Sequence, residues 1–63
     1  MTADPPLVLI TGALGRLGRA TVSSFLEHGY RVRGLDLPSR ANRRAARRID
    51  PRLELIWGDI RDE

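Results

Sequence analysis

The apolar positions of this 63-residue chain change their spacing along the sequence. Leu7 to Thr11 is a run of four apolar residues and a threonine behind two prolines, a pattern typical of a strand buried on both faces of a parallel sheet. Gly12 then opens a glycine-rich turn, and apolar residues recur at helical spacing as far as about His28, on one half of the helical wheel. Gly29 suits the left-handed cap that ends a helix. The apolar half contains Leu14, Leu17, Gly18, Thr21, Val22, Phe25 and Leu26.

The second half of the chain predicts two further strands with a helix between them. Residues 30–36 form the second strand, with Tyr30 expected in the core, and residues 53–57 form the third. Residues 40–48 predict a short helix capped by Ser39, with alanines on one side and arginines on the other. The order is β-α-β-α-β. Right-handed crossovers then predict an α/β fold of three parallel strands in the order 3-2-1 with both helices on one face, the first half of a Rossmann-type doubly wound sheet.

Composition removes several kinds of chemistry. All eleven basic residues are arginine, which excludes a lysine base, a Schiff base or a P-loop lysine within this chain. The absence of cysteine excludes disulfides and thiolates, and one histidine cannot build a His-based metal site, so no metal is expected. The longest apolar run is too short to span a membrane, and the first six residues lack the apolar region of a signal peptide. We therefore expect no membrane partner and a cytoplasmic location.

Charge is unevenly distributed along the chain. Residues 31–52 contain eight arginines and two acids, whereas residues 53–63 contain one arginine and four acids. The arginines of residues 40–52 share one helical side and lack the interleaved aromatic residues on which bases stack. A solvated helix face is therefore favoured over a nucleic-acid patch, and nucleic acid is not the expected partner.

The strongest chemical signal is a G-x-x-G-x-x-G spacing between the first strand and the first helix, formed by Gly12, Gly15 and Gly18. Gly12 allows a tight turn, Gly15 lets a pyrophosphate approach the backbone, and Gly18 lets the helix pack closely on the sheet. Free N–H groups and the helix dipole at such an N-terminus favour an anion. The motif predicts a dinucleotide cofactor, with a purely structural glycine-rich turn as the alternative.

Acidic residues stand where the second and third strands end. Asp36 lies 24 residues after Gly12, where a carboxylate can accept hydrogen bonds from both hydroxyls of an adenosine ribose, which predicts NAD rather than NADP. Against this, the guanidinium of Arg40 could bind a phosphate, unless it is an ordinary solvated charge. Asp59 could accept from the adenine amino group while Ile60 covers the ring, or it could simply start the next helix.

These features resemble the short-chain dehydrogenase/reductase superfamily, and more narrowly its extended branch, the NAD-dependent epimerase/dehydratase family. That family's T-G-x-x-G-x-x-G pattern fits residues 11–18 without a gap. The resemblance implies that Arg16 and Leu17 lie along the pyrophosphate, that Asp36 holds the adenosine ribose, and that Asp59 and Ile60 contact adenine.

The resemblance also implies what the chain lacks. The family's catalytic Tyr-x-x-x-Lys lies past residue 63, and Tyr30 is followed four residues later by Gly34, so no catalytic residue is assigned. Residues 1–63 are expected to be the N-terminal part of an NAD(P)-binding domain, without the rest of that domain or the substrate lobe. Full-length relatives are oxidoreductases and isomerases, largely of nucleotide sugars. Because the substrate lobe is not among these residues, the substrate is not encoded here. Alone, the open sheet of this piece is expected to self-associate. The alternatives are a non-catalytic nucleotide-sensing regulator and a small Arg-rich nucleic-acid-binding protein.

Overall fold

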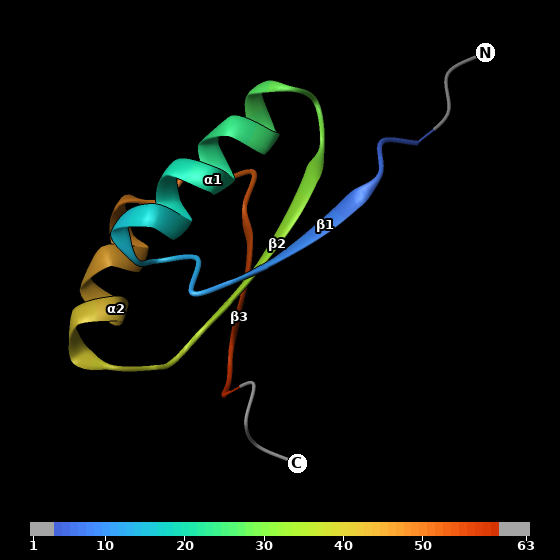
Figure 1. Ribbon diagram of the computed structural model, residues 1–63. Helices are drawn as coiled ribbons and strands as arrows, with labels where there is room; N and C mark the ends of the chain where they lie inside the picture. Colours follow the sequence, from blue (N-terminus) through green and yellow to red (C-terminus); the bar gives the residue numbers. More distant parts are fainter. Residues whose placement is uncertain (1–3, 60–63) are drawn as a thin grey trace.

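The computed structural model describes residues 4–59, which fold as a three-stranded parallel sheet with one helix packed against a face of it (Figure 1). The elements in chain order are β1 (Leu7–Thr11), α1 (Arg16–Glu27), β2 (Arg31–Asp36), α2 (Arg40–Ala45), the 3₁₀ turn η1 (Ala46–Arg48) and β3 (Glu54–Trp57). β2 lies in the middle of the sheet and pairs in parallel with both neighbours. The predicted α/β class, the β-α-β-α-β order and the strand order 3-2-1 are confirmed.

The ends of the helices follow the predicted local chemistry. Gly29 has a φ of +84° directly after the C-cap of α1, a conformation that glycine adopts without strain. The Ser39 side chain accepts a hydrogen bond from the backbone N–H of Asn42 at 3.1 Å, which caps α2. Together α2 and η1 cover the residues 40–48 for which the sequence predicted a helix.

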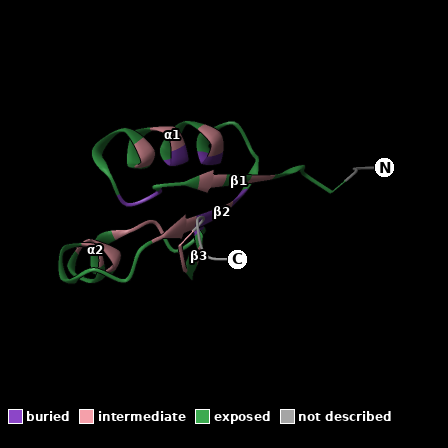
Figure 2. Cartoon of the chain, turned by 60° about the horizontal axis from the view of Figure 1, so that its bottom comes forward, coloured by how far each residue is buried: buried purple, intermediate pink, exposed green. Residues whose placement is uncertain are grey.

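The core lies between α1 and one face of the sheet, where the buried residues gather in Figure 2. The buried members of this cluster are Ala13, Val22, Leu26, Val32 and Leu53, with Ile10, Phe25 and Ile49 packed against them. Ile49, which follows η1, packs on the same cluster as α1, so both crossovers run on the same face of the sheet, as expected (Figure 1). α2 itself has no buried residue.

The other face of the sheet is open and carries both apolar and charged side chains. The strand register places Leu7 beside Arg31 and Leu9 beside Arg33, facing away from buried Val32. Leu9 is 60% exposed. Glu54 of β3 accepts hydrogen bonds from the Arg31 and Arg33 guanidiniums, both at 3.1 Å. These bonds, that of Arg33 above all, lower the pKa of the exposed Glu54 carboxyl.

Two expectations about apolar residues were wrong. Tyr30 is not a core strand residue: it precedes β2, is 37% exposed and packs edge-on against Phe25, with ring centroids 5.1 Å apart. Its N–H still bonds to the Phe25 carbonyl at the end of α1, so strand pairing begins one residue later. β1 is not buried on both faces: Val8 and Ile10 are half-buried, whereas Leu7 and Leu9 are exposed on the open face, which nothing within residues 4–59 covers. Leu17, on the apolar half of the helical wheel, is 81% exposed, because the first turn of α1 stands over the glycine turn and Gly18 takes the inward position there.

Neither helix within residues 4–59 is long and apolar enough to cross a membrane.

Candidate functional site

The backbone conformation and packing of the protein require glycine at positions 12 and 18. Gly12 has a φ of +66°, in the left-handed region that side chains disfavour. A Cβ at Gly18 would overlap the Gly12 carbonyl oxygen and would lie 2.8 Å from the carbonyl carbon. The Gly12 N–H donates to the Leu35 carbonyl at 2.8 Å, which ties this turn to β2. The turn and the start of α1 therefore form one tightly packed unit.

Gly15 differs from these two glycines, because nothing in the protein requires glycine there. Its φ of −73° and ψ of 170° suit any residue, and an added Cβ would make an ordinary contact of 3.4 Å with the Gly12 oxygen. Gly15 is the N-cap of α1 and has no side chain to bond the N–H groups of the first turn, which also contains no acid. An uncapped helix N-terminus of this kind favours an external anion.

The Asp36 carboxylate is held by three N–H donors from three parts of the chain. Its Oδ2 accepts from the backbone N–H of Leu14, in the glycine turn, at 2.8 Å. Its Oδ1 accepts from the backbone N–H of Leu37 at 2.8 Å and from the side-chain amide of Asn42, in α2, at 3.0 Å. Because a carboxylate offers about four lone-pair positions, about one remains for a ligand hydroxyl.

The glycine turn and both predicted acids meet in one hollow of about 320 Å³. Its lining residues are Thr11, Gly12, Leu35, Asp36, Leu37, Gly58 and Asp59. The backbone N–H of Gly58 donates to the Asp36 carbonyl at 3.0 Å, which brings the segment after β3 against the end of β2. This edge of the sheet, outside the carboxyl ends of parallel strands, is where open α/β sheets bind ligands. Ile60, the expected adenine cover, lies outside the described residues.

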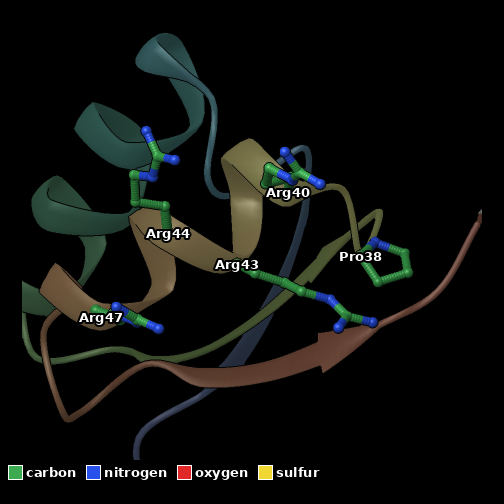
Figure 3. A pocket seen from close by; sticks show the side chains of 5 residues that line it. All are labelled: Pro38, Arg40, Arg43, Arg44 and Arg47. Atoms are coloured by element: carbon green, nitrogen blue, oxygen red, sulfur yellow. The ribbon is translucent and has the colours of Figure 1, made fainter.

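The remaining predicted residues do not line this hollow. Arg16 and Leu17 are exposed in the first turn of α1. Arg40 lies at a second hollow, of about 420 Å³, shown in Figure 3. That hollow is lined by Pro38, Arg40, Arg43, Arg44 and Arg47. These four arginines are exposed and take no part in the three ion pairs found within residues 4–59. The structure thus separates a hollow at the strand ends, lined by glycine, apolar and acidic residues, from a cationic hollow on α2 and η1.

Asn42 is a site residue that the sequence reasoning missed. Its side-chain amide bonds both to the Asp36 carboxylate and to the Leu37 carbonyl, the latter at 2.9 Å. The sequence feature that could have indicated it is its position: Asn42 lies three residues after the capping Ser39, on the helix that follows Asp36. Within residues 4–59, no cluster of His, Asp and Glu side chains is placed to hold a metal ion.

Comparison with known proteins agrees with this geometry. The model of the NAD dependent epimerase/dehydratase family matches residues 8–63. The chain is 45% identical over 53 residues to a protein of Cyanophora paradoxa named Photosystem II assembly factor Ycf39. That alignment covers 84% of this chain but 16% of the relative, so the chain spans a small part of that protein's length. No solved structure matches the chain.

Proposed function

Because this chain belongs to the NAD-dependent epimerase/dehydratase family, whose members bind NAD(P), we propose that it binds the adenosine diphosphate half of NAD. The observation that carries the proposal is Gly15. Its backbone angles and its surroundings would accept a side chain, so its lack of one is explained by a ligand rather than by packing. A pyrophosphate at the uncapped N-terminus of α1 is such a ligand, since it needs close approach to backbone N–H groups.

Each group of predicted site residues has a role in this proposal. The N–H groups at the start of α1 bind the pyrophosphate, and Arg16 and Leu17 flank it. Asp36 accepts a hydrogen bond from the adenosine ribose. Asp59 and Ile60 contact adenine. The bound dinucleotide would supply hydride-transfer chemistry, whereas these residues only bind and orient its adenosine end.

NAD is proposed as the preferred cofactor because of the charge of Asp36. A hydrogen bond from a ribose hydroxyl to a carboxylate contributes about 1.5–3 kcal/mol. A 2′-phosphate in the same place would instead be repelled, by about 4 kcal/mol per unit-charge pair at 4 Å and an effective dielectric near 20. Arg40 and Arg43 could offset part of this repulsion, since both border the cationic hollow beside Pro38 (Figure 3). They do not line the hollow that contains Asp36, so the repulsion should dominate.

The test is to measure the affinity of the intact natural protein for NAD and for NADP by calorimetry. We expect Asp36→Ala to weaken NAD binding about ten- to a hundredfold and to narrow the preference over NADP. Asp4→Ala removes the same charge from an exposed position outside the hollow and should change neither affinity. The assignment of Asp36 is wrong if the wild type binds NADP at least as tightly as NAD and Asp36→Ala leaves the ratio unchanged.

For the intact protein we propose an oxidoreductase or isomerase reaction on a nucleotide sugar, which rests on family membership alone. A second candidate is a dinucleotide-binding protein without catalysis, favoured by the relative, which is named as an assembly factor. Turnover of a nucleotide sugar, followed through the absorbance of reduced cofactor, would separate the two. Dinucleotide binding without turnover across a panel of such sugars would favour the second.

We also propose that the 63-residue chain self-associates when it is produced alone. The open face of the sheet exposes Leu7, Leu9 and Ile56, and within residues 4–59 one edge of β1 is unpaired. Contiguous apolar surface and a free strand edge both favour association with another copy.

A further inference from the structure

We propose that Asn42 is a positioning residue that holds the Asp36 carboxylate toward the ribose and thereby contributes to the choice between NAD and NADP. The inference rests on the proposed dinucleotide site. It adds a determinant on α2, outside both the glycine turn and the strand ends.

The Asn42 side chain is itself held in a defined position. Its amide nitrogen lies 3.0 Å from Asp36 Oδ1 and 2.9 Å from the Leu37 carbonyl oxygen. Both partners are acceptors, so only the NH₂ end of the amide can face them. The backbone N–H of Asn42 is bound in turn by Ser39 Oγ. The amide therefore connects a capped helix to the carboxylate with both of its hydrogens in use.

Asn42 supplies a constraint that the other donor to Oδ1 cannot supply. The N–H of Leu37 belongs to the next residue and moves with the Asp36 backbone. The terminal torsion of an aspartate is broad, so a local donor fixes the carboxylate poorly against the rest of the site. Asn42 donates from another element. Together with Leu14 on Oδ2 it holds the carboxylate from two sides.

The neutrality of Asn42 matters as much as its geometry. Three of the six residues of α2 are arginines, yet the side chain that contacts Asp36 is uncharged. An arginine there would pair with the carboxylate and cancel the repulsion that rejects a 2′-phosphate. An amide instead orients Asp36 and leaves its negative charge in place. Position 42 can therefore influence cofactor choice without contacting the cofactor.

The test compares NAD and NADP binding by the intact natural protein and three variants, with folding checked by circular dichroism. Asn42→Ala should lower NAD affinity about tenfold and reduce the NAD-to-NADP ratio at least about threefold. Ser39→Ala is the matched control, because it removes the cap of the same helix and no contact to Asp36. Because Ser39 holds Asn42 only through the backbone N–H, this variant should reduce the NAD-to-NADP affinity ratio less than Asn42→Ala does.

Asn42→Asp gives a readout that a merely structural role would not change. Two facing carboxylates repel when both are ionised, whereas at mildly acidic pH they share one proton and a hydrogen bond. NAD affinity of this variant should therefore recover as pH falls from about 8 to about 5, with little change in wild type or Asn42→Ala. The other charged groups nearby are Asp59 in the same hollow and the α2 arginines. All of these are present in every protein compared, so position 42 accounts for the difference.

The possible outcomes are distinct. Wild-type affinity and ratio in Asn42→Ala would overturn the positioning role, as would an equal loss in Ser39→Ala. If Asn42→Ala does not fold, the nearly isosteric Asn42→Asp decides, and a flat pH profile overturns the inference. If the wild type binds neither dinucleotide, the proposed function fails, and this inference fails with it.

Discussion

Gly18 lies where α1 approaches the glycine turn most closely, and its replacement by alanine tests that approach. The added Cβ would overlap the Gly12 carbonyl oxygen and lie 3.0 Å from Ala13 Cα. Both are backbone atoms, in a turn tied to Leu35 by a 2.8 Å hydrogen bond, so they cannot rotate away as a side chain would. Overpacking costs about 1–3 kcal/mol, and a backbone clash belongs at the upper end. Alanine recovers about 1 kcal/mol of helix propensity. We expect a net loss of about 2 kcal/mol in the free energy of unfolding, roughly thirtyfold in the folded-to-unfolded ratio.

Gly15→Ala is the matched control, since it adds the same atom three residues earlier in a permitted conformation. It should cost less than about 1 kcal/mol, the range of N-cap preferences, while weakening NAD binding. Both variants would be made in the intact natural protein, with urea unfolding followed by circular dichroism. If Gly18→Ala unfolds at the same urea concentration as the wild type, the close approach of α1 to Gly12 is refuted.

Two further predictions concern stability in acid and self-association. The 2.8 Å hydrogen bond from Arg52 lowers the pKa of Asp50 from 3.8 to about 2. Since the folded-state pKa is the lower one, this pair stabilises the fold above about pH 4 and stops doing so toward pH 2. The stability difference between wild type and Arg52→Ala should therefore fade over that interval in thermal unfolding at a series of pH values, and a constant difference would contradict this. For the chain produced alone, sedimentation should show concentration-dependent association that Leu9→Lys reduces, whereas a monomer at all concentrations would disprove it.

The order of elements could be predicted because it depends on local patterns that tertiary packing here reinforces. The apolar run of β1 and the helical spacing of α1 each bury one side on the same core. Strand boundaries depend instead on which N–H groups find partners across the sheet. The Arg31 N–H reaches the Pro6 carbonyl, whereas the Leu53 N–H is still bonded within a turn to Asp50. Both predicted strands therefore began one residue too early.

The residues of the candidate site were likewise predictable only in part. Gly12 and Gly18 could be recognised from spacing, because backbone turn geometry and helix packing are set within a few residues. The exposure of Leu17 and the contacts of Asn42 could not be predicted, because both depend on where a helix lies relative to the sheet. A helical wheel shows which residues share a side, but not which turn of the helix extends past the core.

Asp36, the proposed ribose acceptor, also connects three segments of the chain. Its carboxylate bonds to the glycine turn and to α2, and its carbonyl accepts the Gly58 N–H beyond β3. Removing the side chain therefore loosens the glycine turn and α2 besides withdrawing a charge from the proposed ribose site, and a loss of NAD affinity alone would not separate these effects. A loosened site weakens both dinucleotides, since they share the same adenosine and pyrophosphate groups. Of the two effects of removing the Asp36 side chain, only the loss of its charge acts oppositely on a 2′-hydroxyl and a 2′-phosphate. The ratio of NAD affinity to NADP affinity is thus the quantity that isolates the electrostatic role of Asp36. It isolates the role of Asn42 too, since Asn42 acts by orienting that carboxylate.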